Sequence, residues 1–170
     1  MRHIILKGRV WKFGDNIGVE HFDVLKEDRR SLIQERGKSA LNVSKGPGLI
    51  FARDVRKSDI MVAGRRFGTG KHHRDIIEVL RELGISAILA LSLDPMFQRE
   101  AINLGIPALA CREIHSIVDS GDLLEFDLRT GRARNLTRDI SIMELSAPEI
   151  LLSILEAGGV EAYTLRRLGA

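Results

Sequence analysis

The segment Asp59-Ile-Met-Val-Ala-Gly-Arg-Arg-Phe-Gly-Thr-Gly-Lys-His-His-Arg-Asp75 determines the organisation of this chain. An apolar run, Ile60 to Ala63, leads into a glycine-rich loop, and an amphipathic run from Ile76 to Leu83 then stops at Gly84. This order predicts a strand, a loop and a helix. The free N–H groups at a helix start, the helix dipole and nearby basic side chains all favour an anion. We therefore expect a phosphate or carboxylate to bind at this turn.

The alternation of strand and helix continues downstream of this unit. The run Ala87 to Leu91 is continuously apolar, as in a strand that is covered on both faces. Asp94-Pro95 provides an N-cap and a first helical residue for a helix that ends at Gly105. A third strand over 107–110 and a short helix over 113–118 follow. The pattern predicts an α/β fold with a largely parallel sheet.

The flanking segments predict further elements. Residues 3–13 read as a strand with a bend at Gly8. Near the C-terminus, the alternating segments 123–128, 132–136 and 140–145 predict an antiparallel β element, and two helices are expected over 148–156 and 160–168.

Residues 17–48 form the least regular part of the sequence. We interpret them as a flexible substrate loop, with a short helical candidate near Ser31 to Arg36. Segment 49–52 is compatible with a strand or a helix.

Composition limits the class of protein. The chain has 170 residues, 44% hydrophobic and 29% charged, which predicts one globular domain over residues 1–170. The net charge of +3 comes from mixed charges, so we expect no nucleic-acid partner. The first apolar run breaks after three residues, which predicts a cytoplasmic protein without a membrane partner. Cys111 is the single cysteine and is interpreted as a buried residue beside a strand rather than a reactive thiol.

The glycine-rich loop does not match two nucleotide-binding motifs. Gly64 and Gly70 are separated by five residues instead of four, and His72 follows Lys71 where a Walker loop has Ser or Thr. Position 73 is histidine where a dinucleotide fingerprint has glycine. ATP and NAD are therefore both disfavoured. A turn whose glycines serve only packing is one interpretation, and the dense positive charge from 65 to 74 favours an anion site instead.

Candidate acid–base residues lie on the loop and in the irregular segment. His72 and His73 are adjacent and point in different directions, so a shared metal is disfavoured. A Lys or His beside an anion suits proton transfer, and solvated loop charges are the alternative. The pair Glu20-His21 is a second acid–base candidate, although a surface pair is the default interpretation.

Several motifs together resemble a known family. They are Gly8-Arg-Val-Trp-Lys-Phe-Gly-Asp-Asn-Ile17, Phe67-Gly-x-Gly70, Ala101-Ile-Asn-x-Gly-Ile-Pro107, Gly121-Asp122 with Asn135-Leu-Thr137, and Ile150-Leu-x-x-Ile-Leu-Glu-Ala-Gly-Gly159. In this order they resemble the small subunit of isopropylmalate dehydratase, and the archaeal homoaconitase small subunit has the same build. The resemblance implies the three-layer α/β/α swivelling domain of the aconitase superfamily. It also implies a large subunit that holds a [4Fe–4S] cluster, and removal and re-addition of water on a hydroxy di- or tricarboxylic acid.

The departures from the family pattern lie in the glycine loop. The family reads Phe-Gly-Cys-Gly-Ser-Ser-Arg-Glu-His, so its catalytic serine falls on Lys71, its second serine on His72 and its substrate-binding arginine on His73. A slip of one residue restores an Arg–acid pair at Arg74-Asp75 and places His72-His73 where the family has its two serines. The second aspartate of a family Asp-Thr-Asp motif falls on Glu20.

The substrate loop and the next strand end also depart from the family. The substrate-loop arginine falls on Lys26, and Arg29 lies where an arginine would suit a substrate with an acidic side chain. The family's Ser-Phe-Ala-Arg-Ile-Phe becomes Ser92-Leu-Asp-Pro-Met-Phe97, which removes another arginine.

The expectations are therefore specific. The expected catalytic residues are Lys71, His72 and Glu20, and the expected substrate-binding residues are Gly68, Thr69, Gly70, His73, Arg66, Arg74, Lys26 and Arg29. We expect no metal ligand in this chain. The resemblance implies the small subunit of a hydro-lyase, 3-isopropylmalate dehydratase first, active only with its large subunit. The alternatives are a homoaconitase-like or other hydroxyacid dehydratase subunit, and a non-catalytic anion-binding or regulatory paralogue. The isolated chain is a possible homo-oligomer.

Overall fold

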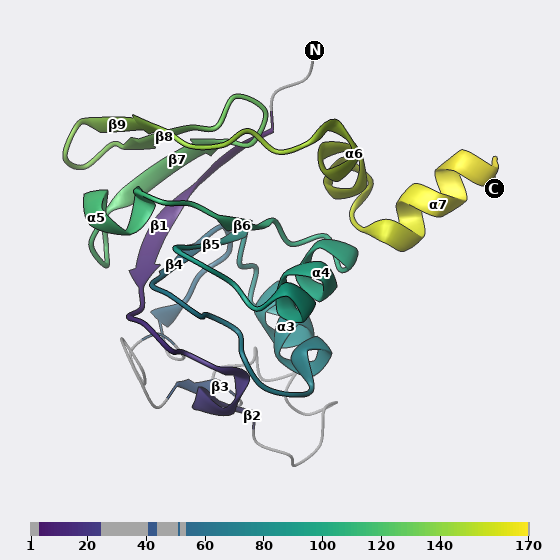
Figure 1. Cartoon of the computed structure of the whole chain (residues 1–170), viewed down its shortest axis with the longest axis horizontal. Coiled ribbons are helices and arrows are strands. Elements are labelled where there is room, and N and C mark those ends of the chain that lie inside the picture. The colour runs from purple at the N-terminus through teal and green to yellow at the C-terminus, as the bar shows by residue number, and fades with distance from the viewer. Residues whose placement is uncertain (1–3, 25–40, 44–50, 52–53, 170) are drawn as a thin grey trace.

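A seven-stranded sheet forms the centre of the molecule (Figure 1). The computed structural model describes residues 4–24, 41–43, 51 and 54–169. The strand order is β6-β5-β4-β1-β7-β8-β9. The bounds are β1 Ile5–Lys12, β4 Ile60–Ala63, β5 Ala87–Ala90, β6 Ala108–Ala110, β7 Leu123–Asp127, β8 Arg132–Asn135 and β9 Ile140–Met143. Strands β6, β5, β4 and β1 pair in parallel, and β1, β7, β8 and β9 pair antiparallel.

Strand β1 joins the two halves of the sheet. Val10 pairs with Ile60 on the parallel side, and Gly8 pairs with Leu124 on the antiparallel side. The strand continues through Gly8, which has a different role from the expected bend. A Cβ on Gly8 would lie 1.8 Å from the carbonyl oxygen of Ser58, so glycine allows the segment before β4 to pass against β1.

Helices cover both faces of the parallel half. Along β4, Met61 joins the apolar core under α3 and α4, whereas Ile60 and Val62 join the core under α5 and α6. The helices are α3 His73–Glu82, α4 Pro95–Asn103, α5 Ile114–Ile117, α6 Glu149–Ala157 and α7 Val160–Leu168. The last of these extends away from the sheet (Figure 1). The expected α/β/α layering is confirmed.

The two helices beside the glycine loop, α3 and α4, begin with different N-cap conformations. Asp94 caps α4 as expected, because its Oδ1 accepts from the backbone N–H groups of Met96 and Phe97 at 2.9 and 3.1 Å. Helix α3 begins at His73, three residues before the apolar run that predicted it, and its N-cap His72 has a left-handed backbone (φ 62°). The glycine loop is therefore shorter than the sequence pattern indicates.

Part of the segment expected to be a loop is regular. A 3-10 turn, η1 Val19–His21, leads into β2 Phe22–Val24, which pairs antiparallel with β3 Leu41–Val43. Strands of three residues are too short to show a clear alternation, so the sequence does not reveal them. The helix expected near Ser31 to Arg36 and the backbone of 49–50 and 52 lie outside the described residues.

Polar residues fix the connection between the two sheet halves. Asn135 is buried, and its Nδ2 donates to the carbonyl of Ile117 and to Asp122, both at 2.7 Å. Its Oδ1 accepts from the N–H of Thr137 at 3.0 Å. Because both ends of the amide are bonded, Asn135 ties the segment before β7 to the turn after β8.

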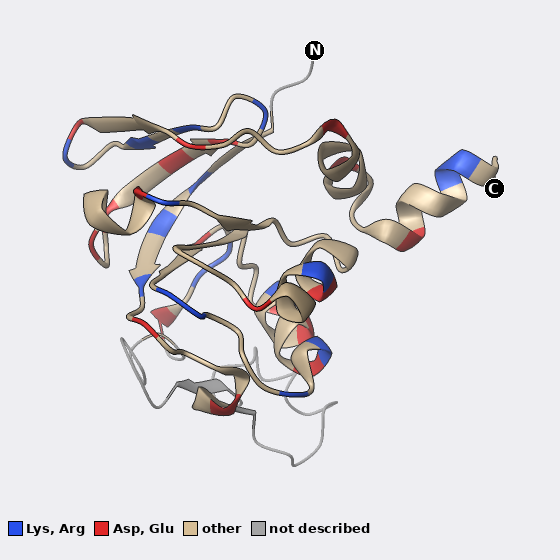
Figure 2. Cartoon of the chain, in the orientation of Figure 1, with Lys and Arg blue, Asp and Glu red and all other residues tan. Residues whose placement is uncertain are grey.

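Charges of both signs are interspersed over the strands and helices rather than gathered on one face (Figure 2). Among the residues that the structure describes, no helix combines the length and the hydropathy that crossing a membrane requires.

Candidate active site

The glycine loop lies where four parallel strands end at one edge of the sheet. Segments 13–18, 64–72, 91–94 and 111–113 follow the carboxyl ends of β1, β4, β5 and β6 respectively. In open α/β sheets, ligands bind in the crevice outside the carboxyl ends of the strands. The loop predicted from sequence to hold an anion is therefore in the position that this architecture uses for binding.

On one side, the loop runs beside the segment that follows β1. Four backbone hydrogen bonds join them: Gly64 N–H to Gly14 O at 3.1 Å, Asn16 N–H to Arg65 O at 2.8 Å, Gly68 N–H to Ile17 O at 2.8 Å, and Val19 N–H to Thr69 O at 2.8 Å. The Gly68 N–H was expected to hold the substrate, and this bond occupies it. Within the described part of the chain, the N–H groups of Gly70 and Lys71 have no hydrogen-bond partner.

On the other side, the segment after β5 supports the loop. The N–H of Phe67 donates to Ser92 O at 3.0 Å, and the N–H of Asp94 donates back to Phe67 O at 2.8 Å. The hydroxyl of Ser92 accepts from the N–H of Arg66 at 2.8 Å. Hydrogen bonds on both flanks therefore fix the backbone conformation of the loop.

The loop backbone is left-handed at alternate positions. Arg66, Gly68, Gly70 and His72 have φ values of 56°, 81°, 119° and 62°. A Cβ on Gly68 would lie 2.4 Å from Cγ of Phe97, so this glycine is required for packing as well as for its φ. Arg66 and His72 are not glycines, and residues held in this region concentrate at functional sites.

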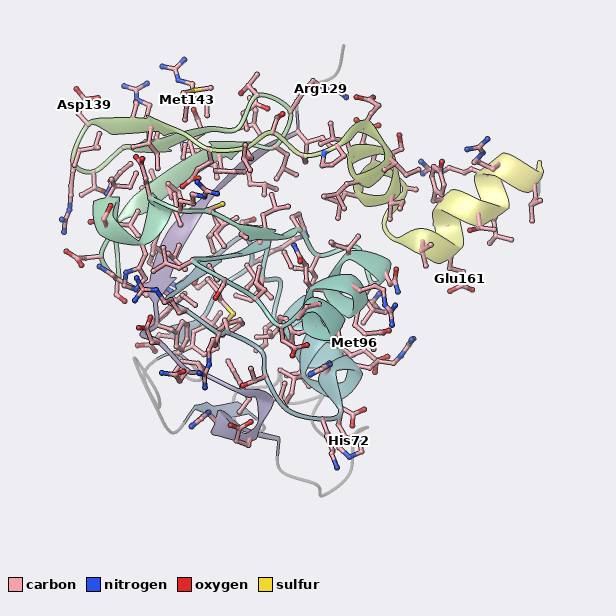
Figure 3. The ribbon with its side chains drawn as sticks, viewed as in Figure 1. His72, Met96, Arg129, Asp139, Met143 and Glu161 are labelled. Carbon is pink, nitrogen blue, oxygen red and sulfur yellow. The ribbon has the colours of Figure 1, made fainter. Side chains whose placement is uncertain are left out.

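Lys71 and His72 lie exposed at the end of the loop. The side chain of His72 projects outward from the start of α3, at the opposite end of the molecule from Asp139 and Met143 (Figure 3). Arg66 is exposed as well, and within the described residues no carboxylate pairs with Arg66 or Lys71. These groups are accessible to an anion.

His73 and Arg74 are placed differently from the loop residues. The His73 ring packs edge-on against Phe97 at 5.9 Å, its side chain is 12% exposed, and its Nε2 lies 4.0 Å from Oδ1 of Asp94. Arg74 donates to Glu78 at 2.8 Å on the exposed side of α3. His73 thus packs between α3 and α4, and Arg74 is engaged one helical turn away from the loop.

Glu20, although distant in sequence, lies beside the loop. A Cβ on Gly70 would be 3.0 Å from Oε2 of Glu20 and 2.5 Å from Cγ2 of Val19. The Glu20 side chain is 62% exposed. The structure thus places the Glu20 side chain against Gly70, which directly precedes Lys71. Lys26 and Arg29 lie outside the described residues.

Asp15 is a residue that the sequence reading did not select. Its Oδ1 accepts from the N–H of Arg65 at 2.6 Å, and its Oδ2 lies 3.9 Å from Nη1 of the same arginine. A Cβ on Gly64 would lie 2.0 Å from Oδ1 of Asp15. The available signal was an aspartate in a turn directly after a strand, which commonly bonds nearby backbone N–H groups.

The described residues and the cysteine content bear on whether this chain holds a metal ion or an iron–sulfur cluster. Among the described residues, no three His, Cys, Asp or Glu side chains gather in a geometry for a metal ion. Cys111 is free and 1% exposed at the end of β6, as its interpretation as a buried residue predicted. Iron–sulfur clusters need several thiolates, so this chain does not fit one.

Cys111 is expected to be unreactive in the folded protein. Burial, with a smaller contribution from Glu144, raises its pKa from 9.0 to about 12. A raised pKa keeps the thiol protonated, and at pH 8 the thiolate fraction falls roughly 1,000-fold relative to an ordinary cysteine. Thiol labelling at pH 8 should therefore be slow in buffer and fast in denaturant. Rapid labelling of the folded chain would contradict the burial.

Comparison with known proteins agrees with this architecture. No protein-family model matches the sequence. The chain is 36% identical over 164 residues to the isopropylmalate/citramalate isomerase small subunit of Methanocaldococcus jannaschii, covering 96% of each chain. It is 37% identical over 164 residues to the methanogen homoaconitase small subunit of Methanothermobacter thermautotrophicus, covering 96% of this chain and 93% of the relative.

A solved structure shows the same fold. The crystal structure of 3-isopropylmalate dehydratase from Methanocaldococcus jannaschii superimposes with a TM-score of 0.80 at 26% identity, covering 97% of this chain and 96% of that one. Fold and site define an α/β/α subunit of the aconitase superfamily, with a glycine loop at the carboxyl edge of its sheet. The chain belongs to the family of 3-isopropylmalate dehydratase small subunits, a hydro-lyase family with close homoaconitase and citramalate isomerase variants. The resemblance drawn from the motifs is confirmed.

Proposed function

We propose that this chain is the small subunit of a two-subunit hydro-lyase that dehydrates and rehydrates a hydroxy di- or tricarboxylic acid, with 3-isopropylmalate as the first candidate. One observation carries the proposal. Exposed Arg66, Lys71 and His72 belong to a glycine loop with left-handed backbone at the ligand-binding edge of the sheet, and the carboxylate of Glu20 lies over Gly70. Such a site offers cations for a carboxylate and titratable groups for proton transfer.

The proposed roles follow from this placement. Arg66 and the N–H groups of Gly70 and Lys71 hold a substrate carboxylate at the loop. Lys71 or His72, in its neutral form, accepts the proton from the carbon next to that carboxylate. The left-handed turn at His72 presents both side chains at the tip of the loop, where the family has two serines.

A large subunit completes the proposed enzyme. Relatives are named as small subunits, which implies a large-subunit partner. The family resemblance implies that the partner would hold a [4Fe–4S] cluster, and the single, buried cysteine of this chain is consistent with that division. When bound, such a cluster supplies a Lewis acid for the leaving hydroxyl group. This chain then contributes the groups that bind the substrate carboxylate and the residue that accepts the proton.

Reconstitution with a large subunit tests the proposal. We expect the isolated chain to show no dehydratase activity, and the complex to turn over 3-isopropylmalate faster than citramalate or a homoaconitase-type tricarboxylate. Absorbance of the unsaturated acid measures turnover for each substrate, and an iron–sulfur protein should co-purify with the chain. Turnover by this chain alone without iron would contradict the proposal. A complex inactive on every hydroxy acid tested would favour the non-catalytic anion-binding alternative.

A further inference from the structure

His21 has a defined bond inside the short turn that carries Glu20. The Nδ1 atom of His21 accepts from the backbone N–H of Gly18 at 3.0 Å, and its side chain is 16% exposed. The same Nδ1 also lies 3.3 Å from the carbonyl oxygen of Gly18, so its role depends on the tautomer. The shorter contact, in which Nδ1 accepts from the Gly18 N–H, requires the proton of the neutral imidazole to be on Nε2. The proposed function uses Glu20 from this turn and leaves His21 without a role.

The carboxylate of Glu20 lies in a slot between two glycines. A Cβ on Gly18 would be 2.3 Å from Oε2 and 2.4 Å from Oε1 of Glu20, and a Cβ on Gly70 would be 3.0 Å from Oε2 of Glu20. Either substitution would therefore meet this carboxylate. The φ of Gly18 is −91°, a value that any residue can adopt. Glycine is therefore needed at position 18 for the space that the Glu20 side chain occupies rather than for its backbone conformation.

The imidazole ring of His21 lies beside the same carboxylate of Glu20. Its Nδ1 lies 3.5 Å from Oε1 of Glu20, and both atoms carry lone pairs when the ring is neutral. Because the Gly18 N–H fixes Nδ1, the imidazole does not donate to Glu20 through that atom and occupies the space beside its carboxylate. Lys71 and His72 are the charged or titratable groups that directly follow Gly70 on the facing loop.

We infer that Gly18 and His21 are positioning residues that hold the carboxylate of Glu20 over Gly70, where it can accept a hydrogen bond from the hydroxyl group of a hydroxy acid. The inference rests on the proposed function of the loop. An anionic carboxylate repels the carboxylates of the substrate and attracts its hydroxyl donor, so the slot orients the acid with its hydroxyl group toward Glu20.

Gly18→Ala is the sharpest probe, because the new methyl group displaces Glu20 without removing it. The contact is with the end of a flexible side chain, so we expect an unchanged melting temperature. In the reconstituted complex, Glu20→Gln and Gly18→Ala should each lower kcat by about 10-fold or more. In a Glu20→Gln background, Gly18→Ala should add less than about twofold, because residues that act through one group are not additive.

Variants of His21 provide a second test of the inference. His21→Leu removes the acceptor and should lower kcat about 10-fold, whereas His21→Asn places an oxygen where Nδ1 lies and should recover most of that loss. The inference would be overturned if Gly18→Ala or His21→Leu lowered kcat as strongly in the Glu20→Gln background as in the wild type. It would also be overturned if His21→Asn recovered none of the activity that His21→Leu loses.

A measurement on the full chain without its partner separates this inference from the proposed function. Long-range proton–nitrogen NMR spectra report which imidazole nitrogen is protonated, and we expect the Nε2–H tautomer for His21. If the complex proves inactive on hydroxy acids while this tautomer is found, the proposed function fails and the placement of His21 stands. A proton on Nδ1 of the neutral ring would overturn the positioning role.

Discussion

Replacing the residue that accepts the proton, Lys71 or His72, is expected to lower kcat of the reconstituted enzyme by about 100- to 10,000-fold, the usual contribution of a positioned proton acceptor. Lys71 is exposed and directly follows the glycine over which Glu20 lies. A loss confined to kcat would indicate proton transfer, and a rise confined to KM would indicate carboxylate binding.

His72 shares this prediction, because either side chain can accept the proton. His72→Asn is the informative change, since asparagine tolerates the left-handed backbone at φ 62° and removes only the imidazole. The residue that accepts the proton should show the full loss, and the other should lose about 10-fold through weaker charge pairing. Steady-state kinetics of both variants with 3-isopropylmalate decides between them.

A matched control removes the same charge elsewhere. Lys7 is an exposed lysine on β1, distant from the carboxyl edge of the sheet, so Lys7→Ala should keep kcat within about twofold of the wild type. If Lys71→Ala and His72→Asn both behave like this control, the loop takes no part in proton transfer.

The second large effect concerns stability. Gly8→Ala is expected to destabilise the protein by about 3 kcal/mol or more, because overpacking against fixed backbone forces both segments apart. The added Cβ would lie 1.8 Å from the carbonyl oxygen of Ser58 and 2.8 Å from its carbonyl carbon, and neither is a flexible side chain. The displaced segment leads directly into β4.

Gly14 offers the matched control for Gly8. Among the described residues, no atom lies within 4 Å of a Cβ built on Gly14, and the φ of Gly14 is not positive, so Gly14→Ala should change stability by less than about 0.5 kcal/mol. Urea unfolding followed by circular dichroism measures both variants. A Gly8→Ala protein as stable as Gly14→Ala would show that the two segments are farther apart than described.

The sequence predicts those features that depend on neighbouring residues. The strand, loop and helix around Gly64 to Lys71, the cap at Asp94 and the three antiparallel segments near the C-terminus all follow from local patterns, and the structure confirms them. The Arg74–Glu78 pair was also readable, because residues four apart share a helix face.

Contacts between distant segments are not encoded in such patterns. Neither the position of β1 between β4 and β7 nor the slot that brings Glu20 to Gly70 follows from spacing. The inward packing of His73 depends on Phe97, which lies on another helix. Family resemblance supplied the link to Glu20, and the structure shows the two glycines that make room for it.

The place of β1 in the sheet has a consequence for how the protein is made. Ile5 pairs with Asp127, so one edge of β1 has no neighbour until the ribosome has synthesised more than two thirds of the chain. An unpaired strand edge attracts other strands, and contacts so far apart in sequence close slowly. Nascent chains that stall before Leu123 are therefore the species most exposed to aggregation, and chaperones that bind early in translation should shield them.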